Sequence, residues 1–308
     1  MKSANDPRGP KALGEEMDRT ATQLCDGIYF GEGPRWKDGR LWFSDFYAKA
    51  VKSVSPKGDM RVEVEIDDLP SGIGWTPDGS LLIVSMVKRQ VLRRTPDGRI
   101  SVHADLSKIA SFHCNDMIVD SMGGAYVGNF GFDLHEDMAK RGDAAVIADH
   151  PTAKLARISP NGAVSVAAES MHFPNGCVIT PDGKTLIVAE TLGGCLTAFA
   201  IEPDGNLSGR RVFAQTWPRV PDGIALDASG AVWVASALTP ECVRIGEGGA
   251  VLETVATSQN CFACMLGGED GRTLFMMTAP TSLASEAAAA PKGRIEVATV
   301  ESPHSGLP

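Results

Sequence analysis

The sequence lacks any apolar run that approaches the roughly 20 residues needed to span a bilayer. It also lacks a basic excess, because 29 Lys and Arg against 38 Asp and Glu give a formal net charge of −9. Nucleic acids and anionic membrane surfaces both require a basic face, so the sequence predicts neither as a partner. The first 20 residues are polar and have no apolar core, which argues against a secretory signal.

Paired cysteines and a serine-nucleophile motif are missing as well. Seven cysteines, an odd number, fit reduced thiols in a cytoplasmic protein better than a disulfide framework. Cys261 and Cys264 are spaced as CxxC, but no second pair could complete a zinc site, so we interpret them as core residues. No Gly-x-Ser-x-Gly elbow occurs, which argues against a serine hydrolase.

What the sequence does contain is a repeat. An apolar pair, a Gly-bearing turn and a short β-rich run recur six times, in RWKDGRLWFSD (35–45), GWTPDGSLLIVS (74–85), IVDSMGGAYVGN (118–129), VITPDGKTLIVAE (178–190), ALDASGAVWVAS (225–236) and LGGEDGRTLFMMT (266–278). The turn glycines are assigned to Gly39, Gly79, Gly124, Gly183, Gly230 and Gly271. Pro-Asp-Gly between two apolar runs predicts a β-hairpin, because Pro presets φ and Gly accepts a positive φ.

Five further hairpins lie between these six, at 53–66, 93–106, 157–169, 200–214 and 244–256. Two hairpins per repeat give four strands, which at this spacing is the period of a propeller blade. The last repeat offers only one further strand, at 293–300, so we expect ATQLCDGIYF (21–30) to supply the missing one and close the ring. The prediction is an all-β protein, a six-bladed β-propeller with four-stranded blades.

The domain plan follows from these repeats. We expect residues 1–20 to form a disordered tail, residues 21–300 to form one propeller domain and residues 301–308 to form a C-terminal tail. The third repeat carries an insertion with some helical character, residues 131–156, between its two hairpins. This insertion is either a tolerated surface loop or a lid over one end of the channel.

Four oxygen-bearing side chains are expected to meet at one mouth of the channel. The first strand of each blade lines the axis, and counting back seven to nine residues from the turn glycines reaches Glu32, Asn115, Asn175 and Asp222. Asn and Asp before Gly could instead form Asx-turns where each blade begins. Two carboxylates at one depth repel each other unless a cation lies between them, and an all-oxygen set suits Ca²⁺, Mg²⁺ or Mn²⁺.

These residues lie in phrases that resemble a known family. GEGPRW, GRLWFSD, NDMIVDSMGGAYVGN, PNGCVITPDGKTLIVAET and PDGIALDASGAVWVAS are similar to the senescence marker protein / gluconolactonase family, which includes regucalcin and bacterial lactonases. The resemblance covers roughly residues 25–300. It implies a six-bladed propeller with one catalytic divalent ion held by residues matching Glu32, Asn175 and Asp222, with Asn115 contacting the metal site or the substrate. We expect Ca²⁺, with Zn²⁺ or Mn²⁺ as alternatives.

One position departs from the family pattern. Sugar-lactone members often carry an Arg two residues before the third-blade Asn, where this chain has His113. An Arg fork binds substrate hydroxyls bidentately and His does not, so the sequence favours a smaller or less polar lactone. His172, three residues before Asn175, is a further candidate for a substrate contact beside the metal, and a surface or packing role is the alternative.

The resulting hypothesis is a metal-dependent lactonase. The cation would polarise the lactone carbonyl, Asp222 would be both a ligand and the general base, and His113 or His172 would be the alternative base. The sequence leaves two other functions open. The same fold could cleave a phosphoester or an aryl ester, or it could be a non-catalytic propeller that binds calcium or a protein partner. The sequence leaves open whether the protein forms a homo-oligomer.

Overall fold

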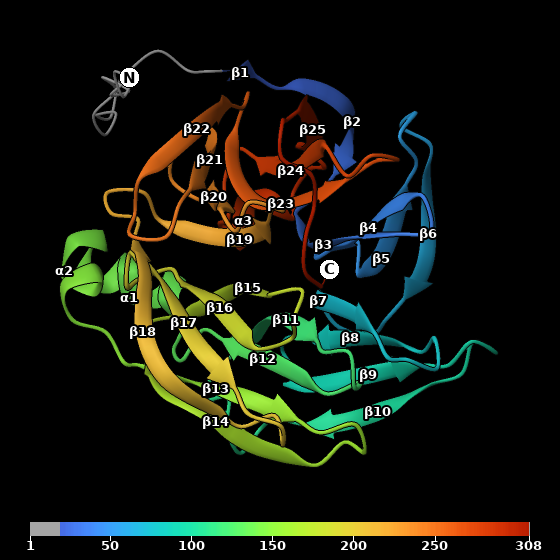
Figure 1. The fold of residues 1–308 in the computed structure, drawn as a ribbon, viewed down its shortest axis with the longest axis vertical. Helices are drawn as coiled ribbons and strands as arrows, with labels where there is room; N and C mark the ends of the chain where they lie inside the picture. The colour runs from blue at the N-terminus through green and yellow to red at the C-terminus, as the bar shows by residue number, and fades with distance from the viewer. Residues whose placement is uncertain (1–18, 308) are drawn as a thin grey trace, which may run out of the picture.

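Six antiparallel sheets are arranged as blades around one axis in the computed structural model, which describes residues 19–307 (Figure 1). Blade one comprises β3 (Gly31–Lys37), β4 (Arg40–Asp45), β5 (Ala50–Val54) and β6 (Met60–Glu65). Blade two comprises β7 (Pro70–Trp75), β8 (Leu81–Ser85), β9 (Gln90–Arg94) and β10 (Ile100–Asp105). Blade three comprises β11 (Cys114–Val119), β12 (Ala125–Asn129), β13 (Ala153–Ile158) and β14 (Val164–Met171).

The remaining blades continue the ring. Blade four comprises β15 (Pro174–Ile179), β16 (Thr185–Glu190), β17 (Cys195–Ile201) and β18 (Leu207–Gln215). Blade five comprises β19 (Pro221–Leu226), β20 (Val232–Ser236), β21 (Glu241–Ile245) and β22 (Val251–Ala256). Blade six comprises β23 (Asn260–Gly267), β24 (Thr273–Ala279), β25 (Gly293–Thr299) and β2 (Thr22–Ile28). The predicted six-bladed, four-stranded propeller is therefore confirmed.

The ring closes as expected, by an N-terminal strand at the edge of the last blade. Strand β2 pairs antiparallel with β25, so that Thr22 faces Val297 and Ile28 faces Gly293. This pairing removes the open sheet edge that blade six would otherwise present. Residues 1–18 of the expected tail lie outside the described residues, and its last two residues belong to a strand. Residues 19 and 20 form β1 (Arg19–Thr20), which pairs in parallel with β22 at the edge of blade five.

The first strands of neighbouring blades contact one another around the axis. Strands β11, β15 and β19 are buried along their whole length, whereas the outer strands β6 and β10 are mostly exposed or half-buried, with one buried residue each. Apolar side chains from adjacent blades form the core clusters, and Trp233, on the second strand of blade five, is fully buried. A buried inner strand explains the apolar runs that the repeats show in the sequence.

The turn of the third repeat differs from its assignment. Five of the six assigned turn glycines have φ between 70° and 84°, but in blade three the residue with positive φ is Gly123, at 86°, and not Gly124. Gly124 is needed for another reason, because a Cβ built there would lie 2.3 Å from Arg157 Nη2. Two consecutive glycines therefore serve two purposes, a left-handed turn and a close contact with a guanidinium group.

The insertion in blade three is helical and lies between β12 and β13, as predicted. It forms α1 (Leu134–Arg141) and α2 (Asp143–Ala148), and Asp133 caps α1 by accepting a hydrogen bond from Glu136 N at 3.0 Å. Helix α2 lies beside β18, since Ile147 and Ala148 share a surface hollow with Arg210 and Arg211. A third helix, α3 (Ala284–Ala287), lies between β24 and β25.

The C-terminal residues predicted as a tail cross one end of the channel (Figure 1). His304 bridges to Asp227 and Leu307 bridges to Ile179, both at the ends of inner strands. The backbone nitrogens of Ser305 and Leu307 donate to Leu226 O and Ile179 O, at 3.0 and 3.1 Å. Because Asn175 and Asp222 stand at the opposite ends of the same two strands, this segment lies at the end of the propeller away from them.

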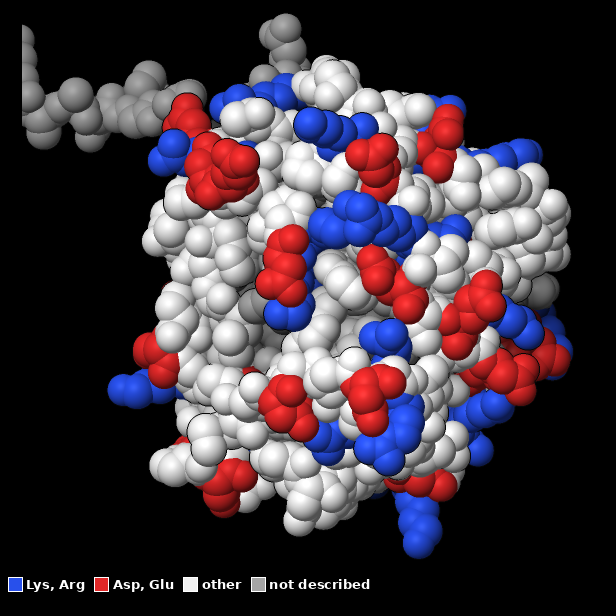
Figure 2. Space-filling model, turned by 90° about the vertical axis from the view of Figure 1, so that its right-hand side faces the viewer, with Lys and Arg blue, Asp and Glu red and all other residues white. Residues whose placement is uncertain are grey.

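The outer surface carries charges of both signs on the side drawn in Figure 2. Figure 2 shows Lys and Arg side chains interspersed with Asp and Glu on the side of the propeller where β6 lies. Within residues 19–307, no helix is long and apolar enough to cross a membrane.

Candidate active site

Each of the six inner strands carries an irregularity in its pairing near its first residues. The register shifts between Glu32 and Arg35, Pro70 and Ile73, Cys114 and Met117, Pro174 and Cys177, Pro221 and Ile224, and Cys261 and Ala263. Such bulges redirect a side chain without ending the strand. The residues predicted at the channel mouth lie within these irregular segments, so they are strand residues and the Asx-turn alternative is wrong.

Glycine follows the site residue in several blades because the inner strands pack closely together. A Cβ on Gly176 would lie 2.6 Å from Ile224 N, and one on Gly223 would lie 2.6 Å from Ala263 Cα. The Asn-Gly and Asp-Gly pairs therefore combine an inward-facing oxygen donor with a residue that lets the next blade approach. This is the physical reason for the pattern that the sequence shows at these positions.

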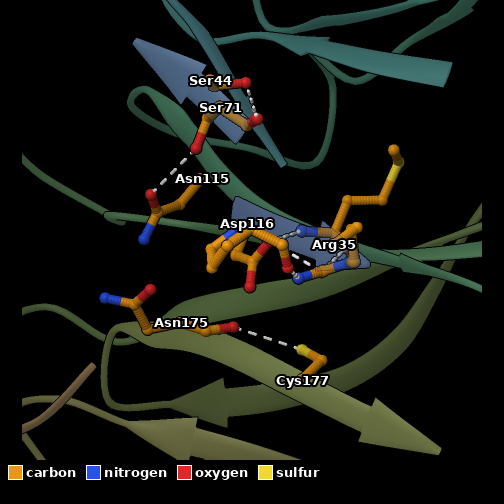
Figure 3. Close-up of polar contacts among 9 residues, drawn as sticks. Arg35, Ser44, Ser71, Asn115, Asp116, Asn175 and Cys177 are labelled. Carbon is orange, nitrogen blue, oxygen red and sulfur yellow. Dashed lines mark hydrogen bonds and ion pairs between the residues drawn. The ribbon is translucent and has the colours of Figure 1, made fainter. Parts of the chain in front are cut away.

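The four predicted residues come together at the floor of one cavity, which Glu32, Asn115, Asn175 and Asp222 all line. Figure 3 shows the Asn115 and Asn175 side chains extending toward the same space from neighbouring strands. Asn115 Oδ1 accepts a hydrogen bond from Ser71 Oγ at 3.3 Å, and Asn175 Nδ2 donates to Thr191 Oγ1 at 3.2 Å. These bonds orient both carboxamides.

The two carboxylates are buried and repel each other. Glu32 and Asp222 are 6% and 7% exposed. Burial raises the pKa of Glu32 well above its usual range, and the charges of Asp222 and Asp116 raise it further. Burial likewise raises the pKa of Asp222 well above its usual range, with Asp116 adding to the effect and the Asn175 amide opposing it. A group of positive charge at this floor would relieve both costs.

A third buried carboxylate, Asp116, and a buried Arg35 were missed in the sequence. Arg35 Nη2 donates to Asp116 Oδ1 at 3.1 Å and to Met117 O at 2.6 Å (Figure 3). Burial raises the pKa of Asp116, while the Arg35 charge and the Met117 N–H oppose that shift. Both residues lie in sequence phrases that resemble the family, Arg35 in GEGPRW and Asp116 in NDMIVDSMGGAYVGN. The signal that could have identified them is a charged residue in a segment predicted as an inner strand of a blade.

The donor set fits a hard divalent cation. Asp222 Oδ1 is buried and has no hydrogen-bond partner among residues 19–307. Arg35, whose guanidinium already bonds Asp116, leaves the negative charge of Glu32 and Asp222 uncompensated. No group of three His, Cys, Asp or Glu side chains in the described part of the chain is arranged as a metal site, so two carboxamides would have to complete this one. Carboxylate and amide oxygens are ligands that Ca²⁺ and Mn²⁺ accept.

Of the two histidines predicted as site residues, one lines the cavity and the other does not. His113 lines the cavity and stacks on Phe112, with ring centroids 4.1 Å apart. Burial lowers the pKa of His113, against the opposing charges of Asp133 and Asp68, which favours the neutral imidazole. The expectation that His172 faces the cavity is not met. Its ring lies in a hollow at the outer side of α2, where Nδ1 is 2.9 Å from His150 Nε2.

The cavity above the floor is lined mainly by apolar side chains. Its volume is about 780 Å³, and its walls include Phe30, Phe46, Phe112, Phe130, Phe173, Val220 and Phe262. The rings contact one another, with centroids of Phe30 and Phe262 4.8 Å apart and those of Phe130 and Phe173 4.5 Å apart. Helices α1 and α2 line the same space, so the insertion forms part of the wall of this cavity and is not a distant surface loop. His113 led us to expect a smaller or less polar lactone. The mainly apolar lining agrees with a less polar substrate, but a cavity of this volume does not require a small one.

Solved structures share this architecture. A luciferin-regenerating enzyme matches with a TM-score of 0.76 and 18% identity, over 94% of this chain and 98% of that one. A calcium-binding protein, regucalcin from Agrobacterium tumefaciens, matches with a TM-score of 0.76 and 19% identity, over 94% and 97% of the two chains. At these identities, the likeness establishes the fold.

Sequence comparisons give the family. The chain is 25% identical to the pentonolactonase XacC of Haloferax volcanii, over 84% of this chain and 85% of that protein. It is also 25% identical to regucalcin of Danio rerio, over 84% and 86% of the two proteins. The family model described as "SMP-30/Gluconolactonase/LRE-like region" matches residues 30–280, which is most of the propeller. This chain therefore belongs to the SMP-30/gluconolactonase/LRE-like family.

Proposed function

We propose that this protein is a divalent-metal-dependent hydrolase that opens a lactone ring. The observation that carries the proposal is the floor of the cavity, where Glu32 and Asp222 are buried together with the carboxamides of Asn115 and Asn175. Family membership supports lactone hydrolysis, since relatives include a pentonolactonase and a gluconolactonase of Zymomonas mobilis. The name of the Agrobacterium relative as a calcium-binding protein supports Ca²⁺ as the ion.

The residues divide the chemistry among them. Glu32, Asn175 and Asp222 would hold the ion, with Asn115 beside it, and the ion when bound would supply Lewis-acid polarisation of the lactone carbonyl. Asn115 and Asn175 orient the substrate without adding charge, because hydrogen bonds from Ser71 and to Thr191 fix their amides. Glu32 balances charge. The apolar walls exclude bulk water from the reacting bond.

Asp222 is the proposed general base. Its Oδ1 has no hydrogen-bond partner within residues 19–307 and could accept a proton from the attacking water. The water oxygen then forms a bond to the carbonyl carbon, the ring C–O bond breaks, and the ring oxygen takes up a proton to give a hydroxy acid. His113 is the alternative base, because it lines the cavity and burial lowers its pKa, which favours its neutral form.

A hydrolysis screen with metal analysis tests the proposal. Purified protein is assayed with a pH indicator over a panel of lactones, aryl esters and phosphotriesters, before and after EDTA treatment. We expect lactones to be preferred, EDTA to abolish the rate, and Ca²⁺, Mn²⁺ or Zn²⁺ to restore it to different extents. Full activity in verified metal-free protein would overturn the metal dependence. A preference for phosphotriesters or aryl esters would overturn the reaction class.

Partners and location are proposed on the same basis. We expect a small-molecule substrate, no nucleic acid or membrane partner, and a cytoplasmic location. These follow from the acidic charge and the free cysteines, all seven of which lie in the described part of the chain.

A further inference from the structure

Helix α1 faces the cavity with an apolar side that the protein leaves only partly covered. Leu134 and Met138, four residues apart, line the cavity from one side of the helix. The other side carries the exposed pairs Lys140–Glu136 and Arg141–Asp137. No residue of α1 is buried. An amphipathic helix normally buries its apolar side against a core, so the space beside Leu134 and Met138 is suited to an apolar ligand.

The wall that α1 and α2 form is held in place. Val146 of α2 is fully buried, and Val146 O lies 2.9 Å from His150 Nδ1. His150 Nε2 in turn lies 2.9 Å from His172 Nδ1 at the start of blade four. Arg141 Nη2 donates to Asp149 O at 2.9 Å, which ties the end of α1 to the end of α2. The apolar wall is therefore present before any ligand binds.

The rim of the cavity is also apolar and is open to solvent. Trp217, Leu238 and Leu283 all line it and are 57%, 65% and 45% exposed. They come from three separate loops, after β18, after β20 and before α3. Exposed apolar side chains that gather around a cavity mark a binding site.

The charged side chains that line the cavity indicate which net charge a ligand can carry. No Lys or Arg among residues 19–307 lines the cavity, whereas Asp133 and Asp143 near the mouth and Glu32 and Asp222 at the floor do. A substrate that carries a carboxylate, phosphate or sulfonate would therefore find no cation to pair with above the floor and would face like charges.

We propose that the cavity binds a neutral lactone with an alkyl or aryl substituent that packs against the Leu134–Met138 side of α1. The inference rests on the proposed lactonase function, since the ring carbonyl would be held at the carboxylate floor with the substituent directed toward the insertion. The aromatic walls and the exposed rim then bury the substituent. Polyhydroxylated lactones would be poorer substrates, because most of the wall is apolar and offers their hydroxyl groups few hydrogen-bond partners. Anionic lactones would be poor substrates, because no Lys or Arg among residues 19–307 lines the cavity.

A chain-length series tests this directly. We would measure kcat/KM with Ca²⁺ for γ-lactones that carry n-alkyl groups of increasing length on the ring carbon bonded to the ring oxygen. Burial of each methylene predicts a rise of about fourfold in kcat/KM over the first few carbons. Gluconolactone, and a lactone whose chain ends in a carboxylate, should both be slower than the alkyl lactone of similar size.

Two matched variants locate the effect. Met138→Lys places a cation on the cavity side of α1 and should flatten the chain-length dependence and raise the relative rate of the carboxylate-ended lactone. Glu136→Lys places the same group on the solvent side of the same helix and should leave the dependence unchanged. If Met138→Lys does not fold, Leu134→Lys tests the same wall. Unchanged chain-length dependence in a folded cavity-side variant would overturn the role of α1.

Measurements of binding affinity test the proposed ligand class separately from the proposed hydrolysis reaction. Calorimetric titration with alkyl γ-lactams, which the protein would not hydrolyse, reports affinity without chemistry. Affinity that rises with chain length while no lactone is hydrolysed would keep the ligand class and overturn the lactonase proposal. Hydrolysis with no chain-length effect on rate or affinity, or a preference for gluconolactone, would overturn the ligand class and keep the lactonase proposal.

Discussion

Arg35 Nη2 donates to Asp116 Oδ1 at 3.1 Å, which joins the inner strands of blades one and three beside the site. Arg35 is 3% exposed and also donates to Pro34 O and Met117 O. Its positive charge is paired with Asp116, whereas Glu32 and Asp222, buried near that pair, each feel the repulsion of Asp116. The negative charge that Arg35 leaves unpaired supports the proposed cation at this floor.

Replacing Arg35 should destabilise the fold strongly. Arg35→Met leaves the Asp116 carboxylate buried without its partner, and breaking a buried pair in this way typically costs about 3–5 kcal/mol. We expect a loss of this size in the free energy of unfolding from urea titration. The double variant Arg35→Met/Asp116→Asn removes both charges and should recover much of it. If the double variant is no more stable than Arg35→Met alone, the loss reflects packing and not the unpaired charge.

The sequence could predict the fold because the information is local. Pro-Asp-Gly turns and short apolar runs identify each hairpin, and their repeat spacing fixes the number of blades. The missing strand of blade six followed from counting, and β2 fills it. The four residues at the channel floor followed from symmetry, since equivalent positions of equivalent strands stand at the same depth.

Three features of the structure could not be predicted from the sequence, because each depends on contacts between segments that are distant in the chain. Arg35 and Asp116 are 81 residues apart, and neither position alone signals a buried pair. The left-handed φ of Gly123 and the Arg157 guanidinium beside Gly124 are two requirements on adjacent glycines, which a single turn pattern cannot separate. The three-residue spacing of His172 and Asn175 in the sequence predicts that both side chains face the cavity. Phe173, with φ of 58°, lies between them, and its ring lines the cavity while His172 pairs with His150 outside.

Acid should loosen the C-terminal segment through His304. Burial lowers the pKa of His304, whereas the same group in the unfolded chain titrates near 6.5. The unfolded state therefore binds more protons between the lowered pKa and about 6.5, and the stabilisation is present above that range and lost as the pH falls through it. We expect hydrogen exchange at the Ser305 and Leu307 amides to become less protected from pH 7 to pH 5.

A pair of variants isolates this effect. His304→Gln cannot titrate, so the protection of these amides should change little with pH. His135→Gln removes another histidine whose pKa burial lowers, on α1, and should keep the wild-type response at the C-terminal segment. Equal pH dependence in His304→Gln and wild type would assign the loosening to another group.

Binding of Ca²⁺ should stabilise the protein independently of any activity. A ligand that binds only the folded state at 100 times its Kd adds about 2.7 kcal/mol to the free energy of unfolding. We expect a rise of this order in urea titrations of metal-free protein with saturating Ca²⁺. The double variant Glu32→Gln/Asp222→Asn, which lacks both carboxylates, should show little rise. An equal rise in the double variant would place the ion elsewhere.

Separate substitutions of Asp222 and Glu32 distinguish a base from a ligand. Asp222→Asn keeps an oxygen for the cation but removes the group that accepts a proton. General-base contributions are typically 10²- to 10⁴-fold, so kcat should fall by about that factor while metal analysis still finds the ion. Glu32→Gln removes charge but no base, so metal affinity should fall first and excess metal should restore the rate.

The histidine variants complete the comparison. His172→Gln should leave kcat unchanged, because His172 lies outside the cavity against His150. His113→Gln should cost little if Asp222 is the base, although His113 lines the cavity and stacks on Phe112. Measurement of kcat and bound metal for all four variants decides between them. An Asp222→Asn enzyme with near-normal kcat at saturating metal, together with a slow His113→Gln enzyme, would transfer the role of base from the carboxylate to the imidazole.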